Sequence, residues 1–272
     1  MALRHEVRTH TFANGLTLLV ETMPDVQSAA FSLMVPAGSI YDPPGANGAA
    51  STLSDWIMRG AGDLDSRQLT TALDNLGLQR SEGPGSSHLS FSGATLAENL
   101  PAALQLYAEI IQRPHLLEAE FAPAQAGIEQ SLKALEDEPR QKIMIELRKR
   151  CYDAPWGLPT EGTLSEVQSL TPEIVRRHFE QNVRPRDAIL AIAGSYQPPT
   201  FANCSRRTSV TRCSCSASIA AAASWAAQTF SMGTPTTATG GAPTGAGEAD
   251  MNRGTSYAHK RRIKSRRCRG VA

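Results

Sequence analysis

Leucine is absent from the last 76 of the 272 residues, and acidic side chains are almost absent there. Residues 197–272 hold 11 Lys or Arg against 2 Asp or Glu, and 40 of them are Ser, Thr, Ala or Gly. Such a segment cannot bury enough apolar surface to offset the entropy lost on ordering. We therefore expect residues 1–196 to form the folded module. Residues 197–272 are expected to be a low-complexity basic tail, either disordered or out of frame.

Long apolar runs and paired cysteines are also missing. No stretch of 18 apolar residues occurs, as a membrane-spanning helix would need, and the first ten residues lack the apolar core of a signal peptide. Only Cys151 lies in residues 1–196, so no disulfide framework supports them. These absences predict a cytoplasmic protein without membrane contact. Residues 1–196 carry 24 acidic and 16 basic side chains, a net charge of −8 that argues against nucleic acid as their partner.

Hydrophobic periodicity predicts strands at both ends of residues 1–196 and helices between them. Alternating apolar residues indicate strands over residues 16–21, 29–35, 88–92 and 188–193. Apolar residues at helical spacing predict helices over residues 48–59, 66–76, 96–113, 121–135 and 143–151, and a further one from Thr171. The pattern is typical of an α+β fold with an antiparallel or mixed sheet and helices packed on one face.

Motifs in a fixed order run through residues 8–196. They are Thr11-Phe12-Ala13-Asn14-Gly15-Leu16, the loop Ala37–Gly48, the helix Leu96–Arg113, the acidic turn Glu136–Pro139, and Gly162-Thr163-Leu164 followed by Arg184-Pro185. In this order and spacing they resemble the N-terminal half of the pitrilysin/insulinase peptidases, the M16 family, which includes the mitochondrial processing peptidase. The resemblance implies the M16/LuxS-like metallohydrolase fold and, for the family, a zinc peptidase activity.

The resemblance also implies a zinc site, but this sequence lacks its residues. The family motif His-x-x-Glu-His lies on the helix after the Gly-rich loop, where residues four apart share a face and can bind one Zn²⁺. Aligned through Gly48 and Gly60, the two histidine positions fall on Ser51 and Asp55, and the general-base position falls on Ser54. Counting back from the acidic turn places the third-ligand glutamate at Ser131.

Neutral hydroxyls are poor Zn²⁺ ligands, and one carboxylate alone cannot hold the metal. The sequence therefore predicts no bound zinc or other cofactor, and no catalytic residue. A relocated metal site is the alternative, drawing on Asp55, His88, His115 or Glu129. Ser51 as a nucleophile with His178 as its base would be another candidate catalytic pair, although no sequence motif connects the two residues.

The candidate peptide contacts are Gly83, Gly85, Ser86 and Ser87, because the family adds its substrate to a sheet edge inside a closed chamber. A mobile turn is the other interpretation of this run. Some bacterial members of the family work as pairs of one catalytic and one non-catalytic subunit. We therefore expect this protein to be the non-catalytic partner of an active M16 peptidase. As such a partner it would help to hold the peptide in a chamber that the two subunits share.

Three alternatives to this function stay open. The first is a structural subunit, like the respiratory-complex core proteins of the family. The second is a truncated or frameshifted remnant of an M16 metallopeptidase gene, with the break near residue 197. The third is an active metalloendopeptidase with a relocated metal site.

Overall fold

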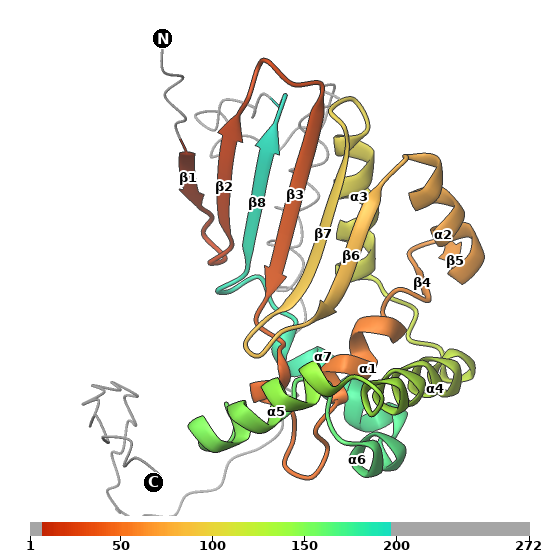
Figure 1. The fold of residues 1–272 in the computed structure, drawn as a ribbon. Helices are drawn as coiled ribbons and strands as arrows, with labels where there is room; N and C mark the ends of the chain where they lie inside the picture. The colour runs from red at the N-terminus through yellow and green to blue at the C-terminus, as the bar shows by residue number, and fades with distance from the viewer. Residues whose placement is uncertain (1–6, 197–272) are drawn as a thin grey trace, which may run out of the picture. The chain divides into compact units, whose positions relative to one another are not determined.

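A mixed six-stranded sheet forms the centre of residues 7–196, the part of the chain that the computed structural model describes (Figure 1). In spatial order its strands are β1 (Val7–Thr11), β2 (Thr17–Thr22), β8 (Ile189–Gly194), β3 (Ser28–Val35), β7 (Leu89–Leu96) and β6 (Gln79–Pro84). Strands β2 and β8 run parallel, and the other neighbours run antiparallel. The predicted α+β fold with a mixed sheet is confirmed.

The strands follow from the alternation in the sequence. In β3 every second side chain is buried, from Ala29 through Phe31 and Leu33 to Val35. The β1–β2 hairpin turns at Asn14-Gly15, where Gly15 has a φ of +90° that suits glycine. Two strands of this sheet escaped prediction, β1 and β6, because both are largely polar. The separate two-residue strands β4 (Gly60–Ala61) and β5 (Leu64–Asp65) were not predicted either.

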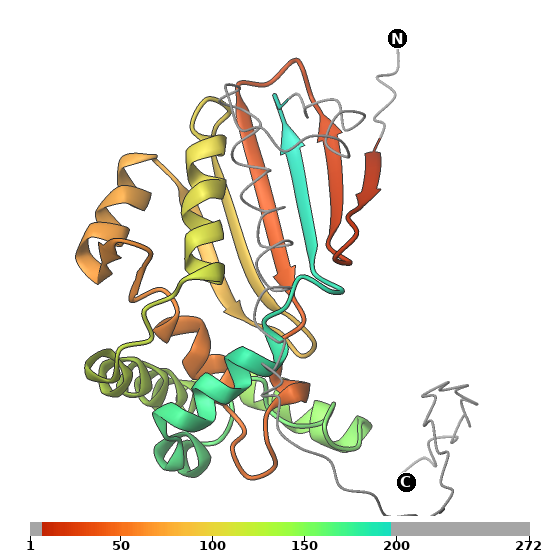
Figure 2. The same cartoon turned by 180° about the vertical axis from the view of Figure 1, so that it is seen from behind.

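One helix covers a face of the sheet, and most of the others gather at one end of it. Helix α3 (Leu100–Gln112) lies over one face of the sheet and runs roughly along the strands, as the rear view in Figure 2 shows. Its Tyr107 ring packs edge-on against Phe31, with ring centroids 4.9 Å apart. Beside strand β6 lie α2 (Ser66–Asn75) and the short strands β4 (Gly60–Ala61) and β5 (Leu64–Asp65).

The helices at the sheet end lie near the tip of the β6–β7 hairpin (Figure 1). They are α1 (Ala49–Trp56), α4 (Glu118–Leu135), α5 (Pro139–Cys151), α6 (Leu164–Ser169) and α7 (Pro172–Asn182). All were predicted except α6, which is too short for a clear period. Among residues 7–196, no helix has both the length and the apolarity to cross a bilayer.

Helix α5 shows where the expected burial is absent. The apolar residues Ile143, Leu147 and Cys151 share one side of the predicted helix, yet no residue of α5 is buried. The predicted tail, residues 197–272, lies outside the described residues, so the boundary at residue 196 stays a prediction.

Candidate functional site

The start of α1 is fixed by a glycine and a buried carboxylate. Gly48 has a φ of +108°, and a Cβ added there would lie 2.6 Å from Val167 Cγ2, so this position requires glycine. The Asp42 carboxylate accepts hydrogen bonds from the backbone N–H groups of Gly48 (2.8 Å) and Ala50 (2.9 Å). These amides would otherwise lack partners at the helix N-terminus, so Asp42 sets where α1 begins.

A histidine from α7 lies against this carboxylate. Burial raises the pKa of Asp42 to about 6, although its backbone hydrogen bonds oppose the rise. Burial lowers the pKa of His178, whose Nδ1 is 3.8 Å from Asp42 Oδ1 and whose Nε2 is 3.2 Å from the Ala37 carbonyl oxygen. The His178 ring therefore faces the loop before α1, and it forms no hydrogen bond with Ser51.

The four positions that the motif alignment predicts for the family's zinc chemistry share one pocket. Ser51, Ser54 and Asp55 from α1 line it together with Ser131 from α4, around a volume of about 420 Å³. The two helices pack near Gly127 of α4, where an added Cβ would lie 3.8 Å from Asp55 Oδ2. The structure thus brings together residues 76 positions apart in sequence, as the spacing of the motif implies.

The donor atoms in this pocket do not fit zinc. The Ser54 hydroxyl donates to the Ser51 carbonyl oxygen (2.7 Å), and the Ser131 hydroxyl donates to the Gly127 carbonyl oxygen (3.1 Å). Asp55 Oδ2 accepts from Arg59 Nη2 (2.9 Å) and Nε (3.1 Å). Two hydroxyls are thus turned back onto their own helices, and a guanidinium already neutralises the carboxylate. No histidine lines the pocket, and its lining offers no tetrahedral set of ligands.

An ion pair joins the two helices at the same place. Arg59 also contacts Glu120 of α4, with its Nη1 3.3 Å from Glu120 Oε2. The guanidinium therefore bridges a carboxylate of α1, Asp55, and one of α4, Glu120. Since its side chain is about a quarter exposed, this bridge contributes modestly to stability.

Glu82 and Glu161 are two further acids that line the pocket, and Glu82 is engaged as well. Tyr107 donates its hydroxyl to Glu82 Oε1 (2.6 Å), and Arg80 Nη1 lies 3.4 Å from the same oxygen. Burial and this hydrogen bond raise the pKa of Tyr107 far above its ordinary value. Glu82 is thus held as an acceptor between two residues of the fold, which leaves it poorly placed to act as a general base.

The candidates for a relocated metal site are not brought together. His115 Nε2 lies 2.8 Å from the Gly62 carbonyl oxygen, and His88 Nδ1 lies 2.8 Å from its neighbour Ser87 Oγ. Glu129 pairs with Lys133 (3.6 Å). Within residues 7–196, no cluster of three or more His, Cys, Asp or Glu side chains could hold a metal ion.

The predicted peptide contacts lie at the tip of the β6–β7 hairpin. Gly83 belongs to β6, while the carbonyl oxygens of Gly85 and Ser86 accept from the backbone N–H groups of Ser39 (3.1 Å) and Ile40 (2.9 Å). The turn is therefore fastened to the loop before α1. What remains open is the outer edge of β6, which pairs with no other strand in the described part of the chain.

Strand β6 lines the candidate site and was not predicted from the sequence. Its Arg80, Glu82 and Pro84 line the pocket beside Ser51 and Asp55. The signal was available, because a Gly-rich turn before a predicted strand implies a hairpin partner on the other side of the turn.

Comparison with known proteins identifies the family. The model for "Insulinase (Peptidase family M16)" matches residues 17–163. The chain belongs to the M16 peptidase family. An uncharacterized zinc protease of Streptomyces coelicolor is 24% identical over 190 residues, which cover 70% of this chain and 41% of that protein. The mitochondrial-processing peptidase subunit beta of Saccharomyces cerevisiae is 22% identical, with 69% of this chain and 41% of that protein covered.

Solved M16 structures share the fold. The M16 peptidase inactive domain from Pseudomonas fluorescens has a TM-score of 0.64 at 19% identity, covering 71% of this chain and 47% of that one. A chain of complex III2 from Candida albicans has a TM-score of 0.60 at 19% identity, covering 71% of this chain and 44% of that one. The M16 chain described here thus spans less than half the length of these relatives, and it corresponds to an N-terminal half.

Proposed function

We propose that this protein is a non-catalytic M16 subunit that holds peptides beside an active zinc peptidase of the same family. The observation that carries the proposal is the donor set at the four ligand and base positions, Ser51, Ser54, Asp55 and Ser131. Three neutral serine hydroxyls, of which those of Ser54 and Ser131 are bonded to their own helices, and a carboxylate bonded to Arg59 supply neither a zinc site nor a base for water.

The peptide-holding part of the proposal rests on β6. Its unpaired outer edge adjoins the pocket, and an extended peptide can add to such an edge through main-chain hydrogen bonds. Arg80, Glu82 and Pro84 of β6 would then lie beside the peptide. This function needs no chemistry from the pocket, only a strand edge next to it.

The pairing part is supported by resemblance. One structural neighbour is described as an inactive M16 domain, and a curated relative is a subunit of the mitochondrial processing peptidase. A protein that lacks the zinc ligands but keeps the fold would serve as the second wall of a shared chamber. Its expected compartment is the cytoplasm.

The test is reconstitution of the full chain with an M16 subunit of the same genome that retains His-x-x-Glu-His. Size-exclusion chromatography with light scattering measures association, and a quenched fluorescent peptide measures cleavage. We expect no cleavage by the chain alone and faster, chelator-sensitive cleavage by the complex. The matched control is the active subunit with its motif Glu replaced by Gln, which should associate equally and cleave nothing. Chelator-sensitive cleavage by the chain alone, or failure to associate, contradicts the proposal.

A further inference from the structure

Helix α5 carries an apolar surface that residues 7–196 leave uncovered. Ile143 is 65% exposed, Met144 63% and Leu147 51%. With Tyr152, Trp156 and Leu158, this short stretch supplies six of the ten large hydrophobic side chains that are exposed in the described part. A concentration of this kind marks an interaction site, because scattered single apolar residues are the usual pattern of a protein surface.

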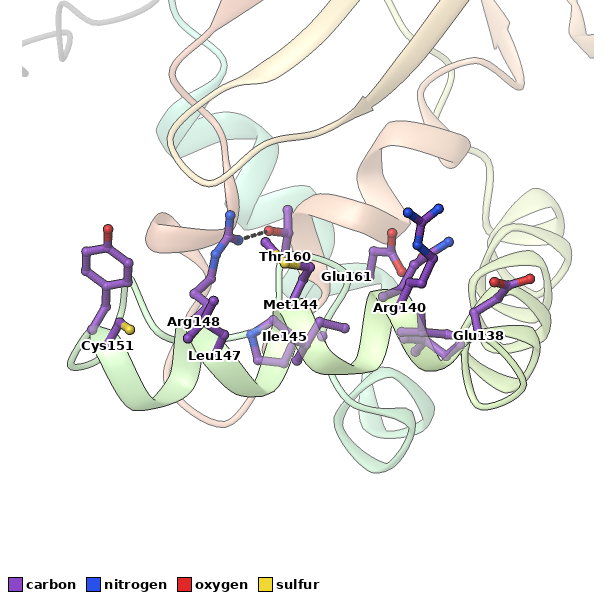
Figure 3. Close-up of a pocket in the computed structure, with 15 residues that line it drawn as sticks. Glu138, Arg140, Met144, Ile145, Leu147, Arg148, Cys151, Thr160 and Glu161 are labelled. Atoms are coloured by element: carbon purple, nitrogen blue, oxygen red, sulfur yellow. Dashed lines mark hydrogen bonds between the residues drawn. The ribbon is translucent and has the colours of Figure 1, made fainter. Parts of the chain in front are cut away.

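One side of α5 forms the wall of a groove (Figure 3). The groove encloses about 850 Å³ between α5, the end of α4 and residues 159–162, which is room for several side chains of a ligand. Its apolar lining includes Leu132, Leu135, Met144, Leu147 and Tyr152.

The groove adjoins the pocket next to β6. Glu161 lines both hollows, and Pro84 of β6 lines the pocket. A peptide that leaves the edge of β6 at its Pro84 end would therefore lie close to the groove. This proximity favours a polypeptide as the occupant.

The charge on α5 is opposite to that of its surroundings. The helix has five basic residues and one acidic residue, whereas the rest of residues 7–196 has 10 basic and 22 acidic ones. Arg140 and Arg148 stand on the groove side of α5 with Met144 between them (Figure 3). Within the described part neither arginine forms an ion pair, and Arg148 Nη1 donates only to Thr160 Oγ1 (2.9 Å).

The two ends of the groove differ in charge. Glu138 and Glu161 accompany Arg140 at one end, while Arg148 at the other end has no acidic neighbour in the groove lining (Figure 3). An acidic group of a ligand is therefore favoured beside Arg148, next to the apolar middle of the groove.

We propose that the α5 groove binds the continuation of a peptide held on β6, and that it selects segments in which large apolar side chains stand next to acidic ones. The proposal deepens the proposed function and rests on it, since it names the class of peptide that the subunit holds. An anionic membrane surface fits less well, because the acidic body around α5 would be repelled by it.

Fluorescence anisotropy of the full chain with labelled twelve-residue peptides tests the proposal. The three probes are an extended Leu/Asp peptide, the same peptide with Lys for Asp, and the same peptide with Ser for Leu. We expect the Leu/Asp peptide to bind at least about tenfold more tightly than either of the other two peptides. Added salt should reduce the difference in affinity between the Leu/Asp peptide and the Lys peptide. Equal binding of all three would overturn the proposal.

Substitutions in α5 locate the site. Arg148→Glu should weaken binding of the Leu/Asp peptide about tenfold, and Met144→Ser should weaken it as well. Arg150→Glu is the matched control, because it makes the same charge change in the same turn outside the groove lining, and binding should stay within about twofold. Circular dichroism confirms that each variant is folded. Equal losses for Arg148→Glu and Arg150→Glu would overturn the assignment to the groove.

The chain is also tested without a peptidase and against vesicles of phosphatidylserine. Peptide binding in this assay needs no second subunit. If reconstitution with an active peptidase fails but Arg148→Glu still weakens peptide binding, the pairing proposal is wrong and the groove proposal holds. If reconstitution succeeds but the groove variants bind peptide normally, only the groove proposal is wrong. Vesicle binding that Arg148→Glu abolishes would assign the surface to lipid and overturn it too.

Discussion

Helices α1 and α5 lie at the same end of the sheet and differ in almost every respect. Every residue of α1 except Asp55 is buried, whereas no residue of α5 is. In α1 the Ser54 hydroxyl donates to its own backbone and Asp55 pairs with Arg59. Arg140 and Arg148 of α5, by contrast, have no ion-pair partner in the described part. Two of the positions that align with the family's zinc chemistry are thus engaged within the fold, although the buried Thr52 Oγ1 has no hydrogen-bond partner among residues 7–196. The exposed apolar surface with unpaired cationic groups lies on α5.

Rebuilding the ligand set on α1 and α4 should produce the largest change. Ser51→His, Ser54→Glu, Asp55→His and Ser131→Glu together restore the family's donors at positions that share one pocket. We expect one zinc per chain by elemental analysis. Free zinc at 1,000 times its Kd should then stabilise the variant by about 4 kcal/mol in thermal unfolding, because only the folded state holds the site.

The matched control places the new glutamate of α4 one residue earlier, at position 130. Gln130→Glu, in place of Ser131→Glu, turns the carboxylate about 100° around α4 and should leave zinc weakly bound. No zinc in the quadruple variant, or equal zinc in both, would show that the alignment of these positions is wrong.

Removing the carboxylate at the start of α1 should change the pH dependence of stability. The folded pKa of Asp42, about 6, lies above its ordinary value of 3.8, so its contribution is fully present below pH 3.8 and is lost as the pH rises through 6. The shift corresponds to about 3 kcal/mol, nearly all of which Asp42→Asn should remove from the change in unfolding free energy between pH 3 and 7.

Urea unfolding at several pH values measures this difference. His178 acts in the opposite sense, since its lowered pKa gives stability that is present above pH 6.5 and lost on acidification. The difference between the stability–pH curves of wild type and Asp42→Asn therefore reports the contribution of Asp42. Asp25→Asn, a substitution at an exposed residue, is the control. Parallel pH curves for wild type and Asp42→Asn would contradict the assignment.

Local patterns in the sequence account for much of α1 and of the candidate site. The 3.6-residue period gives the buried positions Leu53 and Trp56, and motif spacing gives the four residues that share the pocket. The pairing of Asp42 with His178, 136 residues apart, has no local signal. Strand β6 was not predicted because its residues are mostly polar. Periodicity predicts the apolar side of α5, but it does not show whether another part of the protein covers that side.

A smaller gain in stability is expected where α4 packs on α1. Gly127→Ala should stabilise the fold by about 1 kcal/mol, because alanine favours helix and the added Cβ would lie at an ordinary 3.8 Å from Asp55 Oδ2. Gly48→Ala is the contrasting control and should destabilise, since that residue has a φ of +108° and no space for a Cβ. Loss of stability in Gly127→Ala, measured by urea unfolding, would mean that the helices pack more closely than described.

The smallest effect is expected on α5. Leu147→Ala should change the unfolding free energy by less than about 0.5 kcal/mol, because its side chain is 51% exposed. The same substitution at the buried Leu53 of α1 should cost roughly 3 kcal/mol. A cost at Leu147 similar to that at Leu53 would mean that the full chain itself covers α5.

Zinc content of the purified full chain, measured by elemental analysis alongside peptide cleavage in the same preparation, tests the central claim most directly. The account predicts far less than one zinc per chain and no chelator-sensitive cleavage, because Ser51, Ser54, Asp55 and Ser131 provide neither ligands nor a base. One tightly bound zinc together with chelator-sensitive cleavage would contradict it.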